Sequence, residues 1–149
     1  MDGWKILGAP GISDGGAHSV SLFATAAGNI YSAFRETGNS NRTAVMRYFE
    51  DEWIYVGTRD FSSANVSDIA MYVYDETPYV AYKDPSFAYS VTCARNKTGN
   101  WEIPGYQISN GEASFIDIHF DENVQMPYIV FQDGATGKKA AVVRYSGAY

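Results

Sequence analysis

The chain of 149 residues is 46% hydrophobic and 15% aromatic, and it carries a formal net charge of −6. This length and composition suit one domain with a packed core. The acidic balance argues against a nucleic-acid partner, because phosphates attract a basic surface, and against an anionic membrane surface.

The sequence gives no sign of a membrane span or of a secretory leader. No apolar run is long enough to cross a bilayer, and Met1 to Trp4 lack the basic and apolar stretches of a signal peptide. The lone cysteine, Cys93, cannot form an internal disulfide and lies in a predicted strand, so we expect it to be buried. These features indicate no particular cellular compartment.

A tryptophan followed four positions later by a glycine occurs three times along the chain. The tryptophans lie 49 and 48 residues apart, which is close to the length of a β-propeller blade. The three pairs are Trp4 and Gly8, Trp53 and Gly57, and Trp101 and Gly105. Because they recur in every copy, we interpret them as structural, with the tryptophans packed between blades and the glycines in the turn that follows.

Each copy continues with three short segments of strand character. The first alternates apolar and other residues with period two, which predicts a strand, and polar turns separate it from the next two. The first segments are Val20–Ala24, Ile69–Val73 and Ile116–Phe120; the second are Tyr31–Phe34, Tyr79–Tyr82 and Tyr128–Phe131; the third are Ala44–Tyr48, Val91–Arg95 and Ala141–Tyr145. With the tryptophan strand as the fourth, the chain predicts an all-β propeller in a single domain, 1–149, with repeats at about 4–52, 53–100 and 101–149.

The frame of the repeat predicts how the sheets are completed. The chain opens on a fourth strand, Trp4–Gly8, and closes on a third, so the third blade lacks its outer strand. Propellers have about 4–8 blades, so three blades do not close a ring. We therefore expect a homodimer that forms a six-bladed ring, with Trp4–Gly8 of each copy completing the third blade of the other. The other interpretation is that the chain is part of a longer propeller.

Three recurring patterns resemble the repeats of bacterial β-propeller proteins, lectins among them. The patterns are Trp-x-x-(Leu/Val)-Gly, Gly-(Ile/Phe)-Ser-x-Gly-x-Ala and Tyr-Val-Ala-Tyr-x-Asp. They are carried by Trp4, Leu7 and Gly8, by Gly11, Ile12, Ser13, Gly15 and Ala17, and by Tyr79, Val80, Ala81, Tyr82 and Asp84. The third copy departs from them, with Pro104 in place of Leu or Val. The resemblance implies a propeller that serves as a binding scaffold, with carbohydrate as the first ligand.

Polar residues that break the repeat on the innermost strands are the first candidates for a site. They are Asp68, Asp117 and His119, and inner strands line the central channel of a propeller. Asp117 and His119 are two residues apart on one strand, a spacing that suits a metal or a hydrogen-bonded pair, but two ligands are too few for a metal site. We predict neither metal nor cofactor. The alternative is that backbone or channel water satisfies these groups.

The loop Lys83–Tyr89 is the second candidate. Asp84, Phe87 and Tyr89 combine a carboxylate with two aromatic rings, which suits sugar recognition, although Asp84 and Asp133 also stand where a turn needs a brace. The predicted function is a non-catalytic binding or interaction scaffold, with carbohydrate as a possible ligand. The alternatives are a glycosidase-like hydrolase that uses Asp68, Asp117 and His119, and an assembly part without a small ligand.

Overall fold

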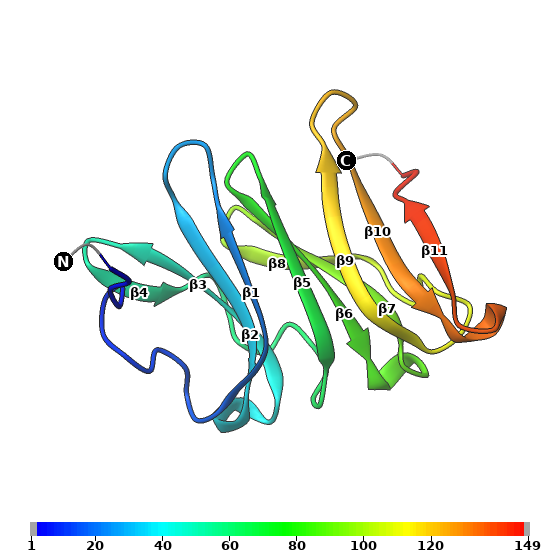
Figure 1. The fold of residues 1–149 in the computed structure, drawn as a ribbon, viewed down its shortest axis with the longest axis horizontal. Coiled ribbons are helices and arrows are strands. Elements are labelled where there is room, and N and C mark those ends of the chain that lie inside the picture. Colours follow the sequence, from blue (N-terminus) through cyan, green and yellow to red (C-terminus); the bar gives the residue numbers. More distant parts are fainter. Residues whose placement is uncertain (1–2, 148–149) are drawn as a thin grey trace.

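The computed structural model describes residues 3–147, which form eleven β-strands in three antiparallel sheets that follow one another around an arc (Figure 1). The first sheet contains β1 (Ala17–Ala24), β2 (Ile30–Glu36), β3 (Arg42–Phe49) and β4 (Glu52–Tyr55); the second contains β5 (Ser67–Tyr74), β6 (Thr77–Asp84), β7 (Ser90–Lys97) and β8 (Asn100–Gly105); the third contains β9 (Ala113–Asp121), β10 (Met126–Asp133) and β11 (Lys139–Arg144). The strands pair in chain order within each sheet, and the third sheet has three strands. The predicted all-β fold is confirmed.

The turn after the second strand of each sheet is a short 3-10 helix. These are η1 (Thr37–Asn39), η2 (Pro85–Phe87) and η3 (Gly134–Thr136). The carboxylate of Asp84 accepts a hydrogen bond from the backbone N–H of Ser86, and that of Asp133 accepts one from Ala135, each at 3.0 Å. The turn-bracing role predicted for these two aspartates is therefore confirmed.

Two of the three hydrophobic clusters lie between neighbouring sheets, and the third, formed by Phe34, Ala44 and Met46, lies on the first sheet alone. Side chains of the first sheet pack on β5 and its neighbours, and side chains of the second pack on β9 and β10. Across the first junction, the Trp101 ring stacks on Phe61 at 3.8 Å, and its Nε1–H donates to the Val56 carbonyl oxygen at 2.9 Å. Trp101 thus packs between blades, as predicted.

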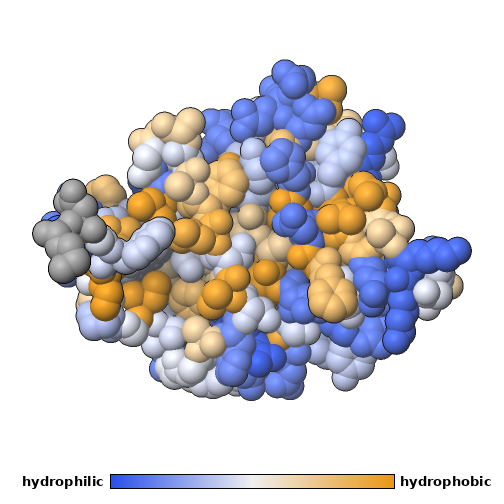
Figure 2. All heavy atoms as spheres, in the orientation of Figure 1, coloured by the Kyte–Doolittle hydropathy of each residue, from blue (hydrophilic) through white to orange (hydrophobic). Residues whose placement is uncertain are grey.

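The inner strands β1, β5 and β9 lie side by side and face the inside of the arc (Figure 1). Each carries an irregularity near its start, where Ser19, Asp68 and Phe115 adopt a left-handed backbone with φ near +50°. The bulge recurs at the same repeat position, so it belongs to the fold and is not particular to Asp68. Hydrophobic residues gather across the middle of the arc, while the strand ends and turns are largely polar (Figure 2).

The segment at residues 4–8 is not a strand in a single copy. It lies beside β4, where the Leu7 carbonyl oxygen accepts a hydrogen bond from Trp53 Nε1–H at 2.9 Å. The edge strand predicted to pair with it, β11, lies at the other end of the arc (Figure 1). A strand needs a neighbour for its backbone hydrogen bonds, and the hydrogen bond that ties this segment to β4 comes from the Trp53 side chain instead. Among residues 3–147 no helix has the length and hydropathy that a membrane span requires.

Candidate functional site

The hairpin between β5 and β6 is flanked by a cavity on each side. Its turn is formed by Asp75 and Glu76, both with positive φ, and Tyr74 and Thr77 close the two strands. The cavity toward the first sheet measures about 620 Å³ and the cavity toward the third about 310 Å³. Both lie within or close to the size range of small-molecule sites, and Tyr74 and Asp75 line both of them. This hairpin is therefore the centre of the candidate site.

The larger cavity combines aromatic faces with carboxylates. Phe23 and Tyr72 pack ring to ring at 4.4 Å, and the Tyr72 hydroxyl donates to Glu122 at 3.3 Å. Glu76, which lines the cavity, accepts a hydrogen bond from the buried Tyr31 hydroxyl at 2.8 Å. The lining residues are Phe23, Ala24, Thr25, Ala26, Ala27, Tyr72, Val73, Tyr74, Asp75, Glu76 and Glu122. A ligand here meets flat apolar rings beside hydrogen-bond acceptors.

The Glu76 carboxylate at this cavity is held ionised by its neighbours. Desolvation pushes the pKa of the Glu76 carboxyl up, but hydrogen bonds from Asn29, Tyr31 and Thr25 outweigh it and lower the pKa. Burial, and then the hydrogen bond to Glu76, raises the pKa of the Tyr31 phenol to about 12. At neutral pH, Glu76 is therefore a carboxylate that accepts, and Tyr31 is a phenol that donates.

The smaller cavity carries positive charge. Arg95 and Lys97 from β7 line it together with Asp75 and Gln125, and Tyr74, Tyr79 and Phe120 supply the aromatic faces. Tyr74 stacks on Phe120 at 4.1 Å and 10°, so the ring is fixed in position. Arg95 is oriented by its ion pair with Glu102 at 3.0 Å. A planar guanidinium and a carboxylate at one opening suit a ligand that is rich in hydroxyl groups.

The inner-strand candidates are separated from one another. His119 lies near the hairpin end of β9 and contacts the Tyr72 ring edge-on at 4.9 Å, which places it beside the larger cavity. Asp117 is exposed on the same side of β9, and its own side chain accepts from the Ile118 backbone N–H at 2.9 Å. Asp68 is half-buried at the opposite end of β5. Within residues 3–147 no group of three or more His, Cys, Asp or Glu side chains is placed to hold a metal ion.

The loop candidates lie at the opposite end of β6 from the two cavities. Asp84 is buried, and besides bracing its turn it accepts from Ser63 at 2.5 Å and from Thr92 at 2.9 Å. Phe87 stacks on Tyr106 at 4.9 Å. Tyr89 is exposed beside Lys83, whose ammonium lies 5.7 Å from the ring and pairs with Glu112. Tyr89 is the most exposed of the three loop candidates.

Sequence reasoning missed the charged residues around the hairpin. Asp75 and Glu76 belong to one of the predicted polar turns, and Arg95 was considered only as the end of a predicted strand. The signal lay in their neighbours, because the turn is flanked by Tyr72, Tyr74 and Tyr79, whereas the first repeat has one tyrosine, Tyr31, around the same turn. Only the packing of adjacent sheets shows that these residues from β5, β6 and β7 meet side chains of β9.

Comparisons with known proteins identify the fold but no family. No family model matches the sequence, and no curated protein is found to be related to it. A fucose lectin from Kordia zhangzhouensis, solved with methyl-fucoside, aligns with a TM-score of 0.56 and 9% identity over 87% of this chain and 93% of the lectin. The two chains are therefore of similar length.

Two glycosidases share the same fold in part of their length. A xylan β-1,4-xylosidase from Bacillus halodurans C-125 aligns with a TM-score of 0.52 and 18% identity, over 89% of this chain and 31% of the enzyme. An α-L-arabinofuranosidase from Lactobacillus brevis aligns with a TM-score of 0.54 and 10% identity, over 86% of this chain and 48% of the enzyme. These structures are propellers, so the likeness shows a β-propeller fold.

Proposed function

We propose that this chain is a carbohydrate-binding β-propeller without catalytic activity, and that the sugar occupies the cavities beside the β5–β6 hairpin. The observation that carries the proposal is the meeting of stacked aromatic rings with ionised planar groups at both cavities. A sugar ring has an apolar C–H face, which suits an aromatic ring, and an edge of hydroxyls, which suits carboxylate and guanidinium groups. A lectin of similar length and fold supports this choice of ligand.

The placement of the carboxylates favours binding over turnover. Glycoside hydrolysis uses two carboxyl groups about 5–9.5 Å apart on opposite sides of the bond. Asp75 and Glu76 are consecutive in one turn, and both Glu76 and Glu122 accept hydrogen bonds from tyrosines. These contacts suit carboxylates that orient a ligand.

A panel of methyl glycosides tests the proposal by calorimetry or by ligand-observed NMR. Methyl-fucoside, xyloside, arabinoside, galactoside and mannoside cover both epimers at several hydroxyls. Tyr74→Ala removes the ring shared by the two cavities, and we expect binding at least ~10-fold weaker, the effect of losing one good contact. Tyr89→Ala is the matched control, because it deletes an exposed tyrosine at the other end of β6. Weaker binding in Tyr89→Ala alone would move the site to the loop, and no binding at millimolar sugar would contradict the proposal.

A glycosidase-like hydrolase is the second candidate. The fold likeness to two glycosidases favours it, and its acid–base groups would be Asp68, Asp117 and His119. The test is release of nitrophenol from a panel of nitrophenyl glycosides. Turnover that disappears in Asp117→Asn but persists in Tyr74→Ala would replace the binding proposal by this one.

We further propose that the binding scaffold is a six-bladed ring of two copies. Three sheets form an arc, and a closed propeller needs at least about four. A twofold dimer supplies six and gives two identical junctions. Its mass would be twice the 16.4 kDa of one chain.

A further inference from the structure

We infer that the apolar cavity between the second and third sheets receives the indole of Trp4 from a second copy of this chain. The inference deepens the two-copy ring proposed above and rests on it. It assigns an occupant to a cavity of about 280 Å³ that lies outside the candidate sugar site. Three independent observations lead to it.

The first observation is a contact that repeats along the chain. Trp53 Nε1–H donates to the Leu7 carbonyl oxygen at 2.9 Å, and Trp101 Nε1–H donates to the Val56 carbonyl oxygen at 2.9 Å. Leu7 and Val56 each lie three residues after the tryptophan of the preceding copy. The indole of one outer strand therefore binds the backbone of the outer strand before it. Pro104 supplies the next carbonyl in this series.

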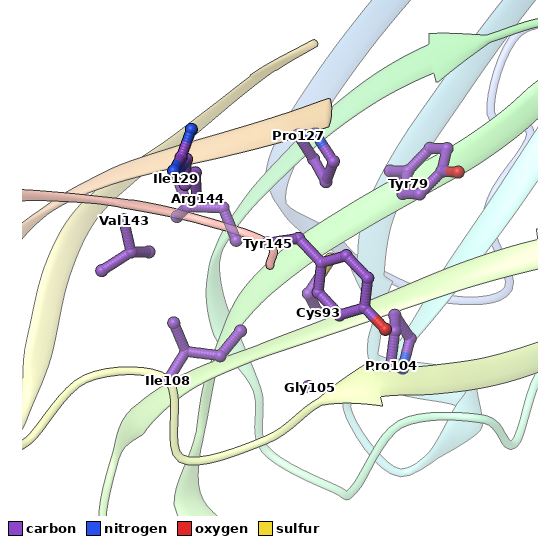
Figure 3. A pocket seen from close by; sticks show the side chains of 10 residues that line it. All are labelled: Tyr79, Cys93, Pro104, Gly105, Ile108, Pro127, Ile129, Val143, Arg144 and Tyr145. Carbon is purple, nitrogen blue, oxygen red and sulfur yellow. The ribbon is translucent and has the colours of Figure 1, made fainter. Parts of the chain in front are cut away.

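The second observation is the composition of the cavity. Pro104, Gly105 and Ile108 line it on the side of the second sheet, and Ile129 and Val143 line it on the side of the third (Figure 3). Ile108 holds the repeat position of Phe61, on which the Trp101 ring stacks. The cavity therefore lies, relative to β8, where Trp101 lies relative to β4. It opens beside β11, the edge strand of the sheet that has only three strands.

The third observation is the exposure of apolar residues at the two ends of the arc. Leu22 of β1 is 68% exposed, whereas Met71, at the same repeat position in β5, is 5% exposed. Val142 of β11 is 66% exposed, whereas Cys93 at its position in β7 is 5% exposed. The two open faces are thus the two halves of the junction that the chain forms twice inside the arc. Each half fits the other half on a second copy.

A second copy suits the cavity better than the chain's own Trp4. Within one copy Trp4 is fully exposed, and Leu7, three residues on, is tied to Trp53 beside β4. The cavity lies between the second and third sheets, and β4 and β11 are at opposite ends of the arc (Figure 1). When β1 of one copy packs on β9 to β11 of another, the same segment lies next to β11. Trp4 then enters the cavity as the outer-strand tryptophan of the third sheet.

Sedimentation velocity and light scattering test the inference on the full chain over about 0.1–100 μM. We expect a dimer, and Trp4→Ala should raise its dissociation constant at least ~100-fold, because both junctions lose a central aromatic anchor. Trp4 is exposed in a single copy, so the unfolding midpoint of the dilute variant should not change. Ile54→Lys is the matched control, because its equivalents in the other copies are Lys5 and Glu102, which are polar.

A mixing experiment tests the orientation of the junction. Leu22→Asp and Val142→Asp each break both junctions of a homodimer, so each variant alone should be monomeric. Their mixture contains a heterodimer with one unaltered junction, so we expect a dimer to reappear. A monomeric wild-type chain would overturn the ring, whereas a dimer insensitive to Trp4→Ala would overturn the Trp4 contact and leave the ring in place. Sugar binding is measured separately, and its absence changes neither outcome.

Discussion

Strands β1 and β5 present the same pattern of residues in opposite environments. The face of β5 lies in the junction between the first and second sheets, whereas the equivalent face of β1 is open to solvent. Val20, Leu22 and Ala24 of β1 alternate like Ile69, Met71 and Val73 of β5, but the former face solvent and the latter are buried. The period-two pattern therefore encodes the requirement for a neighbouring sheet, whether or not one chain supplies it. The comparison shows that the surface at the ends of the arc is apolar and not polar.

The largest expected effect is the difference in the loss of unfolding free energy between Met71→Ala and Leu22→Ala, two substitutions at the same repeat position. Met71→Ala removes a buried side chain and should lower the free energy of unfolding by about 2–5 kcal/mol. Leu22→Ala should cost at most about 0.5 kcal/mol in a single copy, since an exposed position far from special features tolerates truncation. Urea unfolding at submicromolar concentration measures both.

Raising the protein concentration sharpens this comparison. If β1 packs on a second copy, Leu22→Ala becomes destabilising as the wild-type chain associates, because binding adds to apparent stability. Equal costs for the two substitutions in the dilute chain would show that β1 already has a neighbour within one copy, contrary to the structure.

The turn braces provide a smaller contrast between the interior and the open end. Asp84 accepts from Ser63, Thr92 and the Ser86 backbone, so Asp84→Ala leaves three donors without their acceptor and should cost about 2–3 kcal/mol. Asp133 accepts from the Ala135 backbone, and Asp133→Ala should cost about 1 kcal/mol, the usual value of a cap. Thermal unfolding of both variants checks the order. A larger loss from Asp133→Ala would mean that the third sheet carries contacts beyond those of a single copy.

The sequence was sufficient for the repeat and its strands because local rules decide them. Alternation in Ile69–Val73 and Ile116–Phe120 and turn residues between strands depend on backbone preferences that act over a few positions. The braces Asp84 and Asp133 were predictable for the same reason, since each bonds a backbone group two residues away. The sequence also predicted that the third sheet has one strand fewer than the other two.

The candidate site was less accessible to sequence reasoning because it is formed between sheets. Asp75 lines one cavity together with Arg95 and Phe120, which lie 20 and 45 positions later in the sequence. No local sequence pattern specifies that these three residues come together. Conversely, Asp117 and His119 are close in sequence, yet one bonds its neighbouring backbone and the other contacts a tyrosine of β5. Residues from different sheets converge only when the arc of the blades is known.

A pH-dependent effect on stability concerns the thiol at one repeat position inside the arc. Burial raises the pKa of Cys93 from 9.0 to about 12. A pKa that is higher in the folded chain means that stability is complete below pH 9 and is lost as the pH rises toward 12. At pH 10 the cost should be about 1.4 kcal/mol relative to pH 8, since one pKa unit corresponds to about that free energy. Urea midpoints at the two pH values measure it, and Cys93→Ala should remove this part of the loss.

Moving the thiol to the open face completes this test. Val142→Cys in the Cys93→Ala background places a thiol at the equivalent position of β11, which is exposed in a single copy. In the dilute chain it should react readily with a thiol reagent and add no alkaline loss of stability, because an exposed thiolate needs no desolvation. If the end face docks on a second copy, its reaction should slow as the chain concentration rises, and the alkaline loss should reappear. A thiol at this position that reacts equally fast at every concentration would show that the β11 face stays open.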